Sequence, residues 1–83
     1  MKLSPEEQRR AADQLRAILG ERKAALAAGP RSLRDLASVL GVAPPSLQSY
    51  LNGTRSLSTE GDGAVTLGKI AEAVGVKQSE LLT

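Results

Sequence analysis

Cysteine and histidine are both absent from this chain of 83 residues. Their absence excludes disulfide bonds, thiolate nucleophiles, imidazole bases and ordinary zinc or iron sites. Acids such as Asp35 and Glu72 fall at helical surface positions, with no nucleophile, glycine-rich phosphate loop or metal-ligand cluster around them. We therefore expect no enzyme, no metal, no cofactor and no small-molecule substrate.

Aromatic residues and long apolar runs are also scarce. Tyr50 is the single aromatic residue; we expect it in the core, which leaves no stacking platform for single-stranded nucleic acid or RNA loops. No apolar run reaches the roughly 18 residues that a membrane span requires, and the first residues, MKLSPEEQ, lack the hydrophobic core of a signal peptide. These features predict a cytoplasmic protein that does not bind a membrane.

The overall composition is typical of a folded protein, but its charge is unevenly distributed. Hydrophobic residues make up 41% of the chain and charged residues 24%, and a chain of this length can bury one small core, so we expect a single domain over residues 1–83. Residues 1–34 hold eight Lys and Arg against four acids, while residues 35–83 hold three against five. Such a basic segment suits a polyanionic partner, although charge runs are also common on solvated helix faces.

The first predicted helix begins at Ser4-Pro5-Glu6-Glu7, where a capping serine precedes a proline at the first helical position. Gly29-Pro30 should stop it. Its predicted inward residues are Ala12, Leu15, Ile18, Leu19, Ala25 and Leu26. Its basic residues are interspersed with acids, which favours ordinary surface ion pairs; they are Arg9, Arg10, Arg16, Arg22 and Lys23.

Two further helices carry the same cap and the same apolar spacing. Ser32 caps one that Gly41 ends, and Thr66 caps another that Gly75 ends. Their apolar residues occupy positions i, i+3, i+4 and i+7: Leu33, Leu36, Ala37 and Leu40, then Leu67, Ile70, Ala71 and Val74. A last turn is expected over 78–82, and residues 60–63 read as a solvated loop without the ligand pattern of a calcium site.

Residues 32–52 also meet the geometric requirements of a helix-turn-helix. Ala37 is small enough for a close helix crossing, and Gly41 tolerates the positive φ of the turn. The inward positions of both helices are apolar: Leu36, Leu40, Val42, Leu47 and Tyr50. With a helix beginning near Pro45, the predicted fold class is all-α with five helices, because no stretch alternates with period two.

A family resemblance accompanies these features. Residues Ser32 to Arg55, SLRDLASVLGVAPPSLQSYLNGTR, resemble the helix-turn-helix of the Cro/C1-type (XRE-like) DNA-binding family, and TLGKIAEAVGVKQSELL looks like that family's last two helices. The charged first helix and Asn52-Gly53 look most like the N-terminal domain of lambda-type phage repressors. This resemblance covers most of the chain. It implies a five-helix, lambda-repressor-like domain that binds operator DNA in the major groove, usually as a dimer.

Pro44 and Pro45 stand where the second helix of this motif begins. Because proline disfavours the α conformation in the preceding residue, we expect the helix to run from about Pro45 to Asn52, with Pro44 outside it. Each proline removes an N–H that would hold phosphate, whereas Ser46 and Leu47 keep theirs. Family members often read base edges with Gln or Ser at these two positions, while proline offers only apolar contact, for example to a thymine methyl.

The remaining candidate DNA contacts are polar. Gln48 suits an adenine edge, Ser46 and Ser49 suit small polar contacts, and Arg55 suits guanine or the minor groove. Arg55 is the first choice, because lambda-type repressors use the loop position that it matches. Leu33 departs from the glutamine that the family commonly carries there, and is interpreted as core.

Other candidates match phosphate positions of the family. Asn52 and Gly53 do so, with Thr54 beside them, although Asn-Gly is also an ordinary helix stop. Arg31 and Arg34 would hold the adjacent backbone, or serve as plain surface charges.

These features predict a sequence-specific, double-stranded DNA-binding transcriptional regulator, a phage-type repressor that occludes its operator as a homodimer. Val76, Leu81 and Leu82 are candidates for the dimer surface or for closing the core. One alternative is a helix-turn-helix protein-interaction module, such as an antitoxin or phage assembly component, which Leu33, Pro44 and Pro45 favour. Another is an architectural or recombination factor that binds DNA with little sequence preference.

Overall fold

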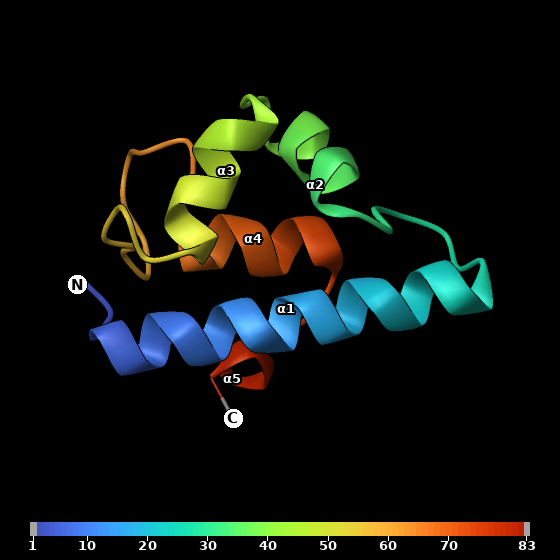
Figure 1. The fold of residues 1–83 in the computed structure, drawn as a ribbon, viewed down its shortest axis with the longest axis horizontal. Helices are drawn as coiled ribbons and strands as arrows, with labels where there is room; N and C mark the ends of the chain where they lie inside the picture. Colours follow the sequence, from blue (N-terminus) through green and yellow to red (C-terminus); the bar gives the residue numbers. More distant parts are fainter. Residues whose placement is uncertain (1, 83) are drawn as a thin grey trace.

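All regular secondary structure in the described part of the chain is helical (Figure 1). The computed structural model describes residues 2–82. Its helices, in chain order, are α1 (Pro5–Ala25), α2 (Leu33–Leu40), α3 (Pro44–Leu51), α4 (Leu67–Val74) and α5 (Gln78–Leu81). An isolated antiparallel bridge joins Lys2 to Ser58, and residues 2–82 contain no strand. The predicted all-α class with five helices is confirmed.

Side-chain caps start three of these helices, as predicted. At α1, the Glu7 N–H donates to Ser4 Oγ at 3.2 Å and the Ser4 N–H donates to Glu7 Oε1 at 3.0 Å. Ser32 Oγ accepts from the Asp35 N–H at 3.1 Å, and Thr66 caps α4 in the same way. Each hydroxyl thus satisfies a backbone donor that the first turn of a helix leaves without a partner.

The end of α1 differs from the prediction. The helix ends at Ala25 because Leu26 adopts a left-handed conformation, with φ 54°, and the Ala27 N–H closes on the Arg22 carbonyl at 3.0 Å. This reversal turns Leu26 into solvent, where 78% of it is exposed, and Ala25 is exposed as well. The predicted core positions of both residues are therefore wrong. Among the described helices, none is long and apolar enough to cross a membrane.

One hydrophobic cluster receives the inward faces of all five helices. In Figure 1, α1 runs along the longest axis, with α5 on one side of it and α2, α3 and α4 on the other. Helix α2 packs against α3 and α4, and α5 packs against α1 and α4. The predicted apolar face of α4 is buried at all four positions: Leu67, Ile70, Ala71 and Val74.

The C-terminal apolar residues also join this cluster. Leu81 is 0% exposed, which makes it a core residue of the single chain rather than a surface for a second copy. Val76 and Leu82 are half-buried and pack against the same core.

The long connection between α3 and α4 is anchored to the start of α4. The Leu67 and Gly68 N–H groups donate to the Ser58 and Thr59 carbonyls, each at 2.9 Å, and Lys69 Nζ donates to the Gly63 carbonyl. A Cβ at Gly68 would lie 3.2 Å from the Thr59 carbonyl oxygen and 3.1 Å from Gln78 Nε2. The connection therefore approaches α4 so closely that only glycine fits at this position without displacing a neighbour.

The α1 cap makes stability depend on pH. The Ser4 backbone N–H, and then its hydroxyl, lower the pKa of the Glu7 carboxyl below its ordinary value. A lowered folded-state pKa stabilises the protein above the unfolded value, and this contribution is lost as pH falls through the folded value. We expect Glu7→Gln to unfold more easily than the native chain at neutral pH, with a difference that shrinks below pH 4.5. Parallel urea titrations across this range measure it, and a difference independent of pH would contradict the assignment.

Candidate nucleic-acid interface

Helices α2 and α3 pack against each other across a short turn that begins at Gly41. Gly41 has φ 74°, and the Val42 N–H donates to the Ala37 carbonyl at 3.0 Å. Ala37 is fully buried between the helices, as are Leu36 and Leu47. The other positions predicted to face inward, Leu40, Val42 and Tyr50, are half-buried against the core. Leu33 is half-buried there as well.

Helix α3 begins at Pro44, one residue earlier than predicted. Ala43 precedes it in an extended conformation, with φ −70° and ψ 143°, and adds no side-chain cap. The prediction excluded Pro44 because a residue before proline disfavours the α conformation. However, the first N–H groups of a helix make no intrahelical hydrogen bond. Pro44 and Pro45, which lack an N–H, therefore break no helical hydrogen bond at these positions.

The first turn of α3 presents fewer donors than expected. The Ser46 and Leu47 N–H groups, predicted to be left for phosphate, both donate to the Ala43 carbonyl, at 3.0 and 3.2 Å. With proline at the two preceding positions, these are the first N–H groups of the helix. The N–H groups that usually bind phosphate at a helix N-terminus are therefore already hydrogen-bonded to the Ala43 carbonyl.

The polar side chains of α3 lie outside the core but are not fully exposed. Ser46, Gln48 and Ser49 are half-buried, whereas Pro44 and Pro45 are exposed. Ser49 Oγ donates to the Pro45 carbonyl at 3.0 Å, so its oxygen is left as an acceptor. Gln48 is the longest polar side chain that α3 carries on this surface.

The residues that follow α3 form a tight polar turn. Asn52 Oδ1 accepts from the Thr54 N–H at 3.0 Å and from Thr54 Oγ1 at 2.6 Å, and Gly53 takes φ 84°. The side-chain oxygen of Asn52 is thus engaged within the turn. Its amide nitrogen is the part of the side chain that can donate to a phosphate oxygen.

Arg55 lies beyond this turn with its side chain in solvent. Its guanidinium carbon is 5.7 Å from the centroid of the Tyr50 ring, and its backbone N–H donates to the Ser49 carbonyl at 3.1 Å. Stacking over an aromatic face restrains an arginine that would otherwise be mobile. Tyr50, predicted as a core residue, is half-buried and supports Arg55.

A buried glutamine on α1, which the sequence analysis did not identify, fixes this whole segment. Gln8 Nε2 donates to the Tyr50 and Arg55 carbonyls, each at 2.6 Å, and its Oε1 accepts from the Leu57 N–H at 3.0 Å. Gln8 is 6% exposed. The spacing of Gln8 before Ala12 and Leu15 places it on the buried face of α1, and this signal would have revealed its burial.

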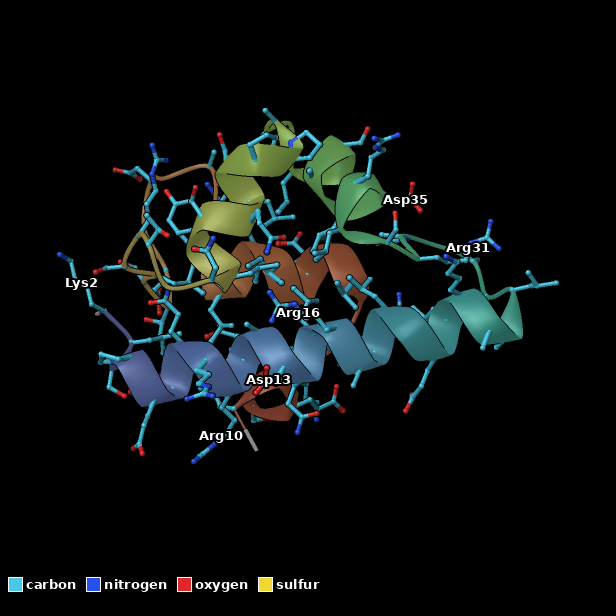
Figure 2. The ribbon with its side chains drawn as sticks, viewed as in Figure 1. Lys2, Arg10, Asp13, Arg16, Arg31 and Asp35 are labelled. Atoms are coloured by element: carbon cyan, nitrogen blue, oxygen red, sulfur yellow. The ribbon has the colours of Figure 1, made fainter. Side chains whose placement is uncertain are left out.

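Basic residues lie at the start of α2 and along α1. Arg31 and Arg34 are exposed, and the Arg31 backbone N–H donates to Asp35 Oδ2 at 3.3 Å (Figure 2). On α1, Arg16 lies 3.8 Å from Asp13, a long ion pair between side chains that are 42% and 68% exposed. Such exposed pairs contribute little to stability.

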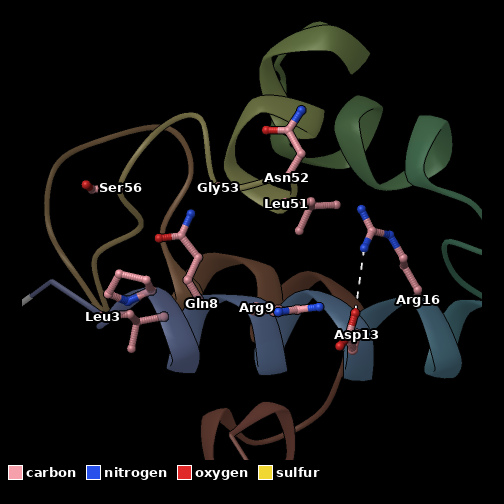
Figure 3. Close-up of a pocket in the computed structure, with 10 residues that line it drawn as sticks. Leu3, Gln8, Arg9, Asp13, Arg16, Leu51, Asn52, Gly53 and Ser56 are labelled. Carbon is pink, nitrogen blue, oxygen red and sulfur yellow. Dashed lines mark ion pairs between the residues drawn. The ribbon is translucent and has the colours of Figure 1, made fainter.

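A groove of about 640 Å³ runs between α1 and the polar turn after α3 (Figure 3). Arg9, Asp13 and Arg16 line it from α1, and Asn52 and Gly53 line it from the turn. Its remaining lining residues are Leu3, Pro5, Gln8, Leu51 and Ser56. The sequence predicted ordinary surface ion pairs for the α1 arginines, whereas the structure places Arg9 and Arg16 beside the predicted phosphate contacts Asn52 and Gly53.

Comparison of the chain with protein-family models, with curated proteins and with solved structures finds no match.

Replacement of Gln8 tests how the segment is held. Gln8→Met keeps the length of the side chain but leaves two carbonyls and one N–H without their partner, and each unsatisfied buried group costs about 1–3 kcal/mol. We expect the free energy of unfolding in urea to fall by about 3 kcal/mol. The exposed Gln78 offers a matched control, because Gln78→Met should change stability by less than about 0.5 kcal/mol. Equal losses in the two variants would show that Gln8 contributes no more than a surface glutamine.

Proposed function

We propose that this chain binds double-stranded DNA in a sequence-specific manner and acts as a transcriptional repressor of the lambda-type phage family. In this proposal α2 and α3 form a helix-turn-helix, and α3 lies in the major groove. The observation that carries the proposal is the fixed position of Arg55, which is stacked on Tyr50 and tied through its carbonyl to Gln8. An exposed arginine beside the end of α3, with its backbone anchored and its guanidinium over an aromatic ring, suits recognition of a base or of the minor groove.

The supporting contacts divide into two kinds. Arg31 and Arg34, at the start of α2, and the Asn52 amide with its neighbours Gly53 and Thr54 would hold phosphates and set the register of the protein on the duplex. Gln48 and Arg55 would read base edges, with Ser46 and Ser49 as smaller contacts. Because the first turn of α3 offers no free N–H, the phosphate contacts concentrate at the two ends of the α2–α3 unit.

Two copies of the chain would be needed on one operator. Each good base contact discriminates by about 1–3 kcal/mol, and one short helix with few polar side chains cannot select a unique site. A homodimer on a palindromic site doubles these contacts. Val76 and Leu82, which are half-buried in the single chain, would supply its interface, and the dimer would block transcription by occupying the operator in the bacterial or phage-infected cytoplasm.

The proposed function predicts a strong dependence of binding on salt. Each neutralised phosphate releases counterions, so log K falls by about 0.9 for each unit of log salt concentration. With Arg31 and Arg34 on separate phosphates, we expect a slope of about −1.8 or steeper per copy. Fluorescence anisotropy with a labelled duplex, titrated across a salt series, measures it. A slope near zero would contradict DNA binding through these groups.

Arg55→Ala tests base recognition. Selection of bound sites from random duplexes, with competitor titration, first provides the operator. On that operator we expect Arg55→Ala to weaken binding by about 1–3 kcal/mol, with a much smaller loss on random duplex. Arg10→Ala is the control, because Arg10 carries the same charge on the side of α1 that faces away from α3 (Figure 2). Equal losses on operator and random DNA would reduce Arg55 to a phosphate contact.

A protein-interaction module is the second candidate function, and the apolar first turn of α3 favours it. Ala43, Pro44 and Pro45 are exposed, and Val39 on α2 is 59% exposed. Such a surface suits a protein partner better than a hydrogen-bonded base edge. A failure to retain any duplex at low salt would favour this candidate, while tight binding with little difference between selected and random duplexes would favour an architectural factor.

A further inference from the structure

Three of the α1 arginines, Arg9, Arg10 and Arg16, face in two different directions. Arg9 and Arg16 line the groove beside Asn52 and Gly53, whereas Arg10 extends from the opposite side of α1 (Figures 2 and 3). Residues 9 and 16 are separated by seven positions, which is about 10 Å along a helix. Two guanidinium groups therefore follow the groove one after the other, instead of being scattered around the helix.

The polar groups that the groove can offer to a ligand are mainly donors. Arg9 and Arg16 donate only, and the Asn52 oxygen is held by Thr54, which leaves its amide nitrogen. Gln8 uses both its nitrogen and its oxygen within the protein. The acid in the groove, Asp13, lies 3.8 Å from Arg16 and partly offsets its charge.

A donor-rich groove with two guanidinium groups suits a ligand with several anionic oxygens. Arginine binds phosphate through paired N–H groups, and each such hydrogen bond is strengthened by charge. A single carboxylate would engage one arginine, whereas two arginines about 10 Å apart along the helix can engage two separate anionic groups, such as successive phosphates. The groove also continues directly into Asn52 and Gly53, which the proposed function places against the DNA backbone.

We propose that this groove holds the phosphodiester backbone of the bound duplex, with Arg9 and Arg16 on phosphates beyond the one at Asn52. This inference rests on the proposed function and extends it, because it adds α1 to the DNA-binding surface. Asp13, which lies 3.8 Å from Arg16, then weakens binding by its charge. The contact is independent of base sequence, so it strengthens binding to operator and random duplex alike.

The test compares matched charge changes on the two sides of α1. Arg9→Gln and Arg16→Gln should each make the slope of log K against log salt shallower by about 0.9 on operator and random duplex. Arg10→Gln removes the same charge from the opposite side and should leave the slope unchanged. Asp13→Asn should tighten binding to both duplexes. All four residues are exposed, and thermal unfolding confirms that each variant is folded.

Several outcomes would overturn the inference. If all three arginine variants change the slope equally, only net charge matters and the groove has no special role. If none changes it while the native chain still binds duplex, the proposed function stands and the groove lies away from the DNA. The groove could also bind free phosphate instead of the DNA backbone. A titration of the native chain with inorganic phosphate, monitored by the Arg9 and Arg16 side-chain NMR signals, distinguishes these two ligands. Saturable binding of free phosphate with unchanged DNA slopes would overturn the assignment to the DNA backbone.

Discussion

The surface after α3 depends on the three hydrogen bonds of one buried side chain. Gln8 bonds the carbonyls of Tyr50 and Arg55 and the N–H of Leu57, so it holds two ends of a chain reversal against α1. Glutamine fits this role because it combines two donors with an acceptor on one planar group. A glutamate would lose the donors and a lysine the acceptor. The stacking of Arg55 on Tyr50 and the far wall of the groove both follow from this one arrangement.

The helices could be predicted because their signals are local. Ser4, Ser32 and Thr66 bond to N–H groups within three residues, and a cap of this kind works before any tertiary contact forms. The apolar spacing of α2 and α4 is equally local. The two errors concern residues that depart from an average preference: Leu26 adopts a left-handed conformation that leucine disfavours, and Pro44 enters the helix despite the proline that follows it.

The candidate site was predictable only in part, for reasons of distance along the chain. The side chains from Pro44 to Arg55 lie on or beside one helix, so periodicity identified which of them avoid the core. Gln8 meets its partners 42 to 49 residues away, and the groove joins α1 to the turn at Asn52 and Gly53. The spacing of residues within one helix cannot predict contacts between positions so far apart in the sequence. The split between Arg9 and Arg16 on one side and Arg10 on the other likewise requires the packed fold.

The glycine at position 68 has a consequence for how this chain can change in length. Glycine at this position lets the preceding backbone lie against α4. In a helix, glycine is less favourable than alanine by about 1 kcal/mol. The attachments fall at Ser58 and Thr59 on one side and at Gly63 on the other. Residues 60–62 lie between these fixed points, within the connection that joins Leu51, the last residue of α3, to Leu67, the first residue of α4. Insertions are therefore best tolerated there, since loop closure becomes only slowly more difficult with length, and the geometry of the helices on either side would be preserved.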